Sequence, residues 1–382
     1  MMTCSGLVAF AGLLSALVAQ DSRPTWNPGL PSLDLATATE LQTVVDREKG
    51  QYLGHPTTVL LDDHTTLLAV YPKGHGKGAI LLKRSRDGGK TWSERLPTPA
   101  SWATSLETPT LFSVRKPDGS PRLLLFSGLY PIRLARSDDE GKTWSELEPI
   151  GKFGGIVAMS SLVSSGDGTL TAFFHDDGRY LRAKGESRPQ GFRVYCTRSR
   201  DCGLTWSEPE LVAHDPKLHL CEPGALRSPD GKTLALLLRE NSRRHGSQVV
   251  FSSDEAKSWS APRELCLALH GDRHVAKYAP DGRLVVVFRD MAAESPTKGD
   301  FVLWVGQWQD LANGTPGALR VRLLDNLNAW DCGYPGLELL PDGTFVATTY
   351  GHWQANEAPY VIAVRFQLGA IDRLLEKRDT KR

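Results

Sequence analysis

The feature that most constrains the fold is a ten-residue motif that the chain repeats. Three close copies and one weaker copy occur: "SRDGGKTWSE" from Ser85, "SDDEGKTWSE" from Ser137, "SRDCGLTWSE" from Ser199 and "SSDEAKSWSA" from Ser252. Successive copies begin 52, 62 and 53 residues apart. A spacing near 50 residues is typical of propeller blades or other stacked structural units.

A second element repeats about thirty residues before each motif and continues beyond the last copy. It consists of two apolar runs joined by a turn such as "PDG" or "GDG", a pattern that predicts a β-hairpin. Six segments fit, beginning at His55, Thr108, Ala158, Glu222, His274 and Tyr334. If another strand pair follows each hairpin, the chain makes six four-stranded antiparallel sheets. The sequence therefore predicts an all-β fold, a six-bladed β-propeller.

The repeated motif, Ser-x-Asp-x-Gly-x-Thr-Trp, is called the Asp box below. Its Ser and Asp side chains can hydrogen-bond nearby backbone N–H groups, its Gly can adopt a positive φ, and its Trp can pack beside the hairpin. We expect it to join the outer two strands of a blade. It is predicted to stabilise the fold and to take no part in chemistry.

The propeller is expected to occupy residues 40–370. Residues 1–19 are predicted to be a signal peptide, because the apolar run Leu7–Ala19 is too short to cross a bilayer and is followed by polar residues. Residues 20–39 form an N-terminal extension and residues 371–382 a charged C-terminal tail. The stretch "TELQTVVDREKG" is expected to supply the strand that closes the ring. A secreted or periplasmic location follows, with no membrane span.

Composition narrows the possible partners. Formal net charge is +1, from 45 basic and 44 acidic residues, which favours neither a nucleic-acid nor an anionic-membrane partner. The six cysteines are scattered without CxxC spacing, so no zinc site is predicted. No cofactor and no metal are expected.

In a propeller, the starts of the innermost strands and the ends of the second strands face one mouth of the central channel. The strand-one starts are rich in ionisable and aromatic residues: His55, Glu107, Glu222, Arg273, His274, Asp331 and Tyr334. The strand-two ends add Arg239, Arg289 and the run "HDD" from His175. Such a concentration favours a binding or catalytic mouth.

Four Asp boxes on six hairpins resemble the sialidase (neuraminidase) superfamily, from about residue 40 to 370, and bacterial exo-sialidases in particular. That resemblance implies a tyrosine nucleophile deprotonated by a glutamate, because a neutral phenol is not repelled by a sugar carboxylate. Tyr334 in "DCGYPG" and Glu222 in "LCEPGA" match this pair.

The resemblance also implies three arginines that bind the substrate carboxylate. Arg239 in "LLLREN" matches the second arginine, and either Arg289 or Arg273 matches the third. His55 stands where the family has its first arginine. His75 lies near the position of the family's acid/base aspartate, and a histidine can serve that role at neutral pH. His175, Asp176 and Asp177 begin a longer loop; the two aspartates are alternative acids, and His175 and Asp177 are expected to contact substrate.

The resemblance thus implies a secreted exo-acting glycoside hydrolase that releases a terminal acidic sugar, with an acidic glycan as partner. Sialic acid is the first candidate, and a related nonulosonic or uronic acid the second. Two alternatives remain: a hydrolase or lyase that acts on uronic-acid polysaccharide, and a carbohydrate-binding propeller without catalysis.

Overall fold

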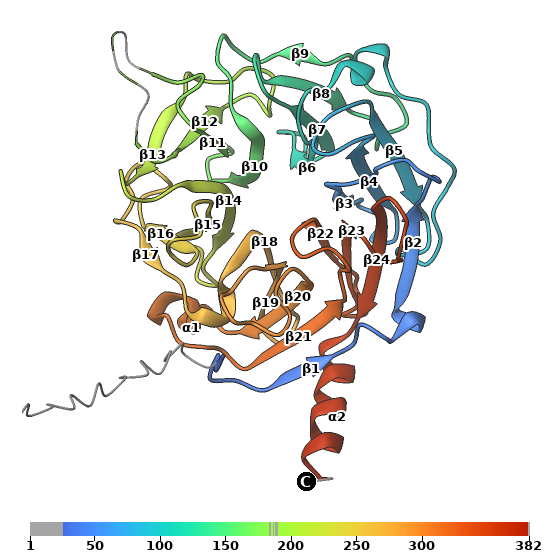
Figure 1. Cartoon of the computed structure of the whole chain (residues 1–382). Coiled ribbons are helices and arrows are strands. Elements are labelled where there is room, and N and C mark those ends of the chain that lie inside the picture. The colour runs from blue at the N-terminus through green and yellow to red at the C-terminus, as the bar shows by residue number, and fades with distance from the viewer. Residues whose placement is uncertain (1–25, 183–184, 186, 188–189, 381–382) are drawn as a thin grey trace, which may run out of the picture.

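The computed structural model describes residues 26–182, 185, 187 and 190–380, and it shows six β-sheets arranged around an axis (Figure 1). The signal peptide predicted at residues 1–19 lies outside the described residues. Blade one contains β3 (Thr57–Leu60), β4 (Leu67–Pro72) and β5 (Ile80–Ser85). Blade two contains β6 (Thr110–Arg115), β7 (Pro121–Ser127), β8 (Arg133–Ser137) and β9 (Glu148–Pro149).

Blade three contains β10 (Ile156–Ser164), β11 (Leu170–Asp176), β12 (Arg193–Ser199) and β13 (Glu210–His214). Blade four contains β14 (Leu220–Arg227), β15 (Leu234–Glu240), β16 (Gln248–Ser252) and β17 (Arg263–Glu264). Blade five contains β18 (Gly271–Tyr278), β19 (Leu284–Asp290), β20 (Phe301–Gly306) and β21 (Leu319–Leu324).

Blade six is closed by a strand from the beginning of the propeller. It contains β22 (Gly333–Leu339), β23 (Phe345–Gly351) and β24 (Tyr360–Phe366), and β2 (Gln42–Asp46) pairs antiparallel with β24. The predicted ring closure is therefore confirmed. The first strands of neighbouring blades contact one another around the axis, so their starts converge at one mouth.

The six-bladed fold is confirmed, with two local differences from the four-stranded pattern. In blade one, residues 93–96 bond to β5 through Ser93 N and Leu96 N without forming a regular strand. In blade five, β1 (Ser32–Asp34) adds a fifth, parallel strand beside β21. The N-terminal extension thus takes part in a sheet.

Helices lie outside the blades. The α-helices are α1 (Trp308–Asn313), between β20 and β21, and α2 (Leu368–Asp379), which projects from the ring near β1 (Figure 1). In the described ranges the remaining elements are three 3-10 turns: η1 (Thr39–Leu41), η2 (Ala100–Thr104) and η3 (Leu267–Leu269). Among the described residues, the structure contains no helix long and apolar enough to span a membrane.

The hydrophobic core lies between adjacent blades. Val70 of blade one and Leu125 of blade two, for example, are fully buried in one cluster. A further cluster joins Leu67 of blade one to Val346 of blade six, so the packing continues around the ring. Continuous packing of this kind explains why the blades form one unit.

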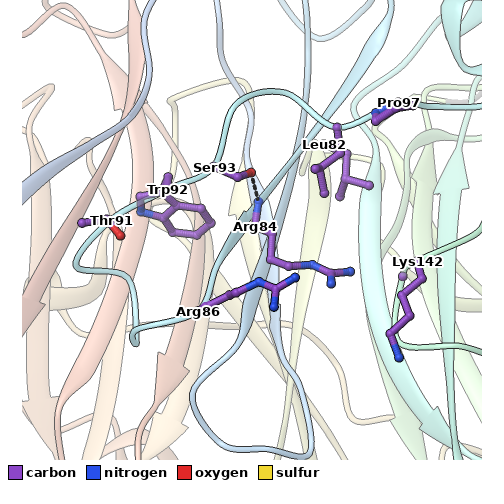
Figure 2. A pocket seen from close by; sticks show the side chains of 10 residues that line it. Leu82, Arg84, Arg86, Thr91, Trp92, Ser93, Pro97 and Lys142 are labelled. Carbon is purple, nitrogen blue, oxygen red and sulfur yellow. Dashed lines mark hydrogen bonds between the residues drawn. The ribbon is translucent and has the colours of Figure 1, made fainter.

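The Asp box closes the turn after the third strand of a blade, as predicted. In the first copy, Thr91 N and Thr91 Oγ1 donate to Asp87 at 2.9 and 2.6 Å, and Gly89 N donates to Ser85 Oγ at 2.8 Å. Gly89 has a φ of +81°, which only glycine adopts at low cost. Figure 2 shows Trp92 beside this turn and the hydrogen bond from Arg84 N to Ser93 Oγ. The pocket in that view is lined by residues of β5 and the Asp-box turn and lies away from the mouth.

Candidate active site

The side chains at the mouth are aimed by β-bulges at the starts of the innermost strands. In β14, β18 and β22 the strand advances three positions where its neighbour advances two. At these bulges Glu222, Arg273 and Tyr334 have φ values of +52°, +55° and +51°. A bulge with a positive φ turns a side chain out of the normal strand alternation. Three predicted site residues are thus directed by the same backbone device.

Tyr334 and Glu222 come from blades six and four and touch each other. The Tyr334 hydroxyl donates a hydrogen bond to Glu222 Oε1. Only 9% of Tyr334 and 3% of Glu222 is exposed to solvent. Burial, reinforced by the negative charge of Glu222, holds the pKa of Tyr334 well above its usual range. The phenol is therefore neutral at rest and already paired with a base.

Arg239 links this pair to a buried ionic cluster. Arg239 Nη1 donates to Glu222 Oε1 at 2.7 Å, and Arg239 Nε lies 3.2 Å from Asp272 Oδ1. Arg243 donates from both Nη atoms to Asp272, at 2.5 and 2.6 Å. Arg289 donates from Nε to the same carboxylate at 2.9 Å. Burial opposes ionisation of Asp272, but the surrounding arginines hold its pKa below the usual range.

The two candidates for the third arginine differ in position. Arg289 joins the Asp272 cluster and also donates to the Cys332 carbonyl at 2.9 Å. Arg273 donates instead to the Ser160 carbonyl at 2.8 Å, and its guanidinium lies 5.9 Å from the Tyr334 ring centroid. Arg273 therefore lies beside the ring of Tyr334, the nucleophile candidate, whereas Arg289 shares the Asp272 carboxylate with Arg239.

His55 and His75 lie on the blade-one side of the site. The ring centroid of His55 is 4.3 Å from that of Tyr334 and 4.8 Å from that of His75. His75 Nδ1 lies 2.6 Å from the Tyr52 hydroxyl, which donates at 2.8 Å to Asp331. The side chain of His75 is 55% exposed, so it can reach a bound ligand. His55 is buried, and burial lowers its pKa well below the ordinary value.

The end of β11 supplies residues with different roles: His175 and Asp176 are its last two residues, so the loop begins at Asp177 and not at His175 as predicted. His175 is buried at the mouth and accepts a long hydrogen bond from Glu222 N at 3.4 Å. Burial, followed by the charge of Arg239, lowers the pKa of His175 to about 3. Asp176 accepts backbone N–H groups of the following loop, from Gly178 at 2.9 Å and Leu181 at 3.1 Å. Asp176 is thus engaged in holding the loop.

These side chains surround a cavity of about 360 Å³ at the mouth. Its ionisable and aromatic lining includes His55, His75, Lys77, Glu107, His175, Asp177, Arg179, Glu222 and Tyr334. Asp177 lies in this lining and pairs with Arg179 at 2.9 Å. Burial raises the pKa of Glu107, and the charge of Glu222 adds to that effect.

Several residues of the site were not singled out from the sequence, among them Asp272, Arg243, Arg179, Tyr52 and Tyr350. Tyr350 donates to Asp331 at 3.0 Å and lies 3.3 Å from His55 Nε2. The sequence did hold one signal for Asp272: it directly precedes Arg273, which was itself a predicted site residue. Within the described residues, no group of three or more His, Cys, Asp or Glu side chains is arranged to hold a metal ion.

The fold is similar to those of several solved structures. A protein of unknown function from Dyadobacter fermentans has a TM-score of 0.67 at 14% identity, covering 85% of this chain and 97% of its own. The GH93 α-L-arabinofuranosidase of Fusarium graminearum has a TM-score of 0.63 at 14% identity, covering 86% and 98%. The NanB sialidase of Streptococcus pneumoniae has a TM-score of 0.60 at 12% identity, covering 86% and 70%.

The sequence comparisons give a second line of evidence. A search of curated proteins found no relative that matches this chain. The model of the BNR repeat-like domain matches residues 127–346. With the NanB sialidase among the similar structures, the predicted resemblance to the sialidase superfamily is confirmed. Because the matched region covers more than half of the 382 residues, the chain belongs to the BNR repeat-like domain family.

Proposed function

We propose that the protein is an exo-acting glycoside hydrolase that uses Tyr334 as its nucleophile and Glu222 as the base that activates it. The observation that carries this proposal is the hydrogen bond from the Tyr334 hydroxyl to Glu222 at the wall of the cavity. A buried tyrosine with a raised pKa is a poor nucleophile unless a base accepts its proton during attack. Glu222 is placed to do so.

In the proposed reaction, Tyr334 Oη attacks the anomeric carbon as its proton passes to Glu222. The glycosidic bond breaks, and an acid in the cavity protonates the departing oxygen. Water then cleaves the tyrosyl–sugar bond: the former acid, now a base, takes a proton from the water, and Glu222 returns its proton to the departing Tyr334 oxygen. Arg239 orients the Glu222 carboxylate through the 2.7 Å hydrogen bond.

His75 is the first candidate for the acid, because it is exposed to the cavity and held by Tyr52 and Asp331. Asp177 is the second candidate, also at the cavity wall. Glu107 is a third candidate, because it lines the cavity and burial raises its pKa, which favours the protonated form that an acid needs. Loss of the true acid should slow substrates with poor leaving groups most, so variants H75N, D177N and E107Q are compared on aryl and alkyl glycosides.

Two classes of released sugar are each supported by a separate observation. The sialidase resemblance and the arginines support a terminal acidic sugar such as sialic acid. The similar fold of an α-L-arabinofuranosidase supports a neutral pentose. A panel of fluorogenic glycosides that includes both classes identifies the substrate, and an unsaturated product absorbing in the ultraviolet would indicate elimination instead.

The mechanism is tested with Tyr334→Phe and Glu222→Gln on the best substrate of that panel. We expect kcat/KM to fall at least about 10³-fold for Tyr334→Phe and about 10²–10⁴-fold for Glu222→Gln. Tyr360→Phe is the matched control, because Tyr360 lies in β24 at a distance from the cavity lining. Wild-type turnover by Tyr334→Phe would remove the proposed nucleophile.

The apolar run at residues 7–19 supports export of the protein. N-terminal sequencing of the protein from the producing cell's exterior tests this: a mature chain starting near Gln20 is expected, and an intact N-terminus would contradict it.

A further inference from the structure

Asp272 is an ionised carboxylate enclosed by arginines. It lies in β18 immediately before Arg273 and is completely buried. Arg243 and Arg289 both donate hydrogen bonds to it, and Arg239 Nε lies 3.2 Å away. One carboxylate therefore serves three guanidinium groups from blades four and five.

The guanidinium donors of Arg243 and Arg289 are engaged within the protein, whereas Arg239 Nε is buried close to Asp272 without a hydrogen bond of good geometry. Arg289 directs Nε and Nη2 to Asp272, and Nη1 to the carbonyls of Trp330 and Cys332. Arg239 directs Nη1 to Glu222 and Nε toward Asp272. A planar guanidinium pairs well with a carboxylate when two parallel N–H groups point at it. Asp272 already accepts such pairs of N–H groups from Arg243 and from Arg289.

The residues that line the cavity also indicate that these arginines are not available to a ligand. In the described part of the chain, Arg239, Arg273 and Arg289 lie behind the cavity wall and do not line it. The wall carries the carboxyl side chains Glu107, Asp177 and Glu222 and the cationic side chains Lys77 and Arg179, and Arg179 is already paired with Asp177. His55 and His175, which also line it, have lowered pKa values and are neutral near pH 7. A substrate carboxylate would therefore have to compete with Asp177 for Arg179, and it would have to displace Asp272 in order to pair with Arg289.

We propose that Asp272 is a built-in carboxylate that fills the arginine cluster, so that the site selects neutral glycosides over glycosides of acidic sugars. This inference rests on the proposed glycoside hydrolase and names its substrate class. It reverses the acidic-sugar expectation that the arginines raise when they are considered from the sequence alone. Asp272 is thereby a specificity-determining residue.

The first test measures binding, so that it does not depend on turnover. Calorimetry compares free N-acetylneuraminate and glucuronate with neutral arabinose and glucose. For the wild-type protein, we expect at least one neutral sugar to bind tenfold more tightly than either acid. Preferential binding of an acid by the wild type would overturn the inference, whether or not any glycoside is hydrolysed.

Asp272→Asn removes the charge with little change of shape and frees donors of Arg239 and Arg289. We expect it to strengthen binding of the acidic sugars at least tenfold, with a smaller effect on neutral ones. Asp62→Asn is the matched control, because Asp62 pairs with Arg115 at 2.5 and 2.6 Å on the surface. Unchanged acid binding by folded Asp272→Asn contradicts the inference; if that variant does not fold, the wild-type measurement decides.

Turnover separates the two proposals. Reporters with one leaving group, 4-methylumbelliferone, are prepared on neutral pentoses and hexoses, on glucuronic acid and on sialic acid. A kcat/KM at least 100-fold higher for a neutral glycoside supports both proposals. Faster hydrolysis of an acidic glycoside leaves the hydrolase standing and overturns the role of Asp272. Sugar binding that favours neutral ligands without any hydrolysis removes the hydrolase and retains the selectivity of the cluster.

Discussion

His175, one of the buried histidines at the mouth, makes the free energy of unfolding depend on pH in a predictable direction. In the folded protein, burial lowers the pKa of His175 to about 3. In the unfolded chain a histidine titrates near 6.5, so below that pH the unfolded state takes up a proton that the folded state refuses. Protonation therefore stabilises the unfolded state, and stability falls as the pH drops below about 6.5.

The magnitude follows from the two pKa values. The whole difference corresponds to about 5 kcal/mol, but it is reached only below pH 3. Between pH 7.5 and 5.5 the contribution of His175 is about 1.4 kcal/mol. Carboxylates with lowered pKa values, such as Asp272, lose their contribution only at lower pH.

Urea unfolding at pH 7.5 and pH 5.5 isolates this term when the wild type is compared with His175→Gln. The wild type should lose about 1.4 kcal/mol more of its free energy of unfolding between the two pH values than the variant does. Comparing the two losses cancels opposing groups such as Asp300, whose pKa burial raises to about 6. His245→Gln, at an exposed position, should keep the wild-type dependence. Equal losses in the wild type and His175→Gln would refute the reasoning.

Two further changes test the scaffold by chemical unfolding. Asp87→Ala removes the acceptor of both Thr91 hydrogen bonds and should cost about 1–3 kcal/mol; a change below about 0.5 kcal/mol would show that the Asp box does not stabilise its turn. Gly224→Ala would place a Cβ atom 2.2 Å from the His274 carbonyl oxygen and should also cost about 1–3 kcal/mol, whereas Gly166→Ala meets nothing within 4 Å and should be nearly neutral. Equal stability of the two alanine variants would contradict the close approach of blades four and five.

The fold was readable from the sequence because its signals are local. Hairpin turns and Asp boxes directly adjoin the strands that they join; the hairpins recur in all six blades and the Asp boxes in four. The less regular outer strands were harder to predict. Residues 93–96, at the end of the first Asp box, bond to β5 without forming a strand, and β1 pairs with β21 over a separation of 288 residues (Ser32 with Arg320). Pairing over such a distance leaves no periodic pattern.

The site was only partly readable, for a related reason. The family motifs pointed to Tyr334 and Glu222, which do touch. Asp272 was missed because its partners Arg243 and Arg289 lie 29 and 17 residues away in sequence, and only the fold brings them together. Arg239 and Arg289 were predicted from the sequence to bind a substrate carboxylate, whereas their contact with an internal carboxylate is a property of packing.

The bulges explain how a repetitive scaffold acquires a site that does not repeat. At the far end of each inner hairpin, the Asp-Gly turn fixes the register of the two strands. An additional residue must then be accommodated at the near end, which is the mouth. In blades four, five and six that residue adopts a positive φ, and its side chain turns out of the normal strand alternation. Because the bulge is a backbone feature, the residue on it can be Glu222, Arg273 or Tyr334 without changing the blade. The chemistry of the mouth can therefore vary while the packing between blades is preserved.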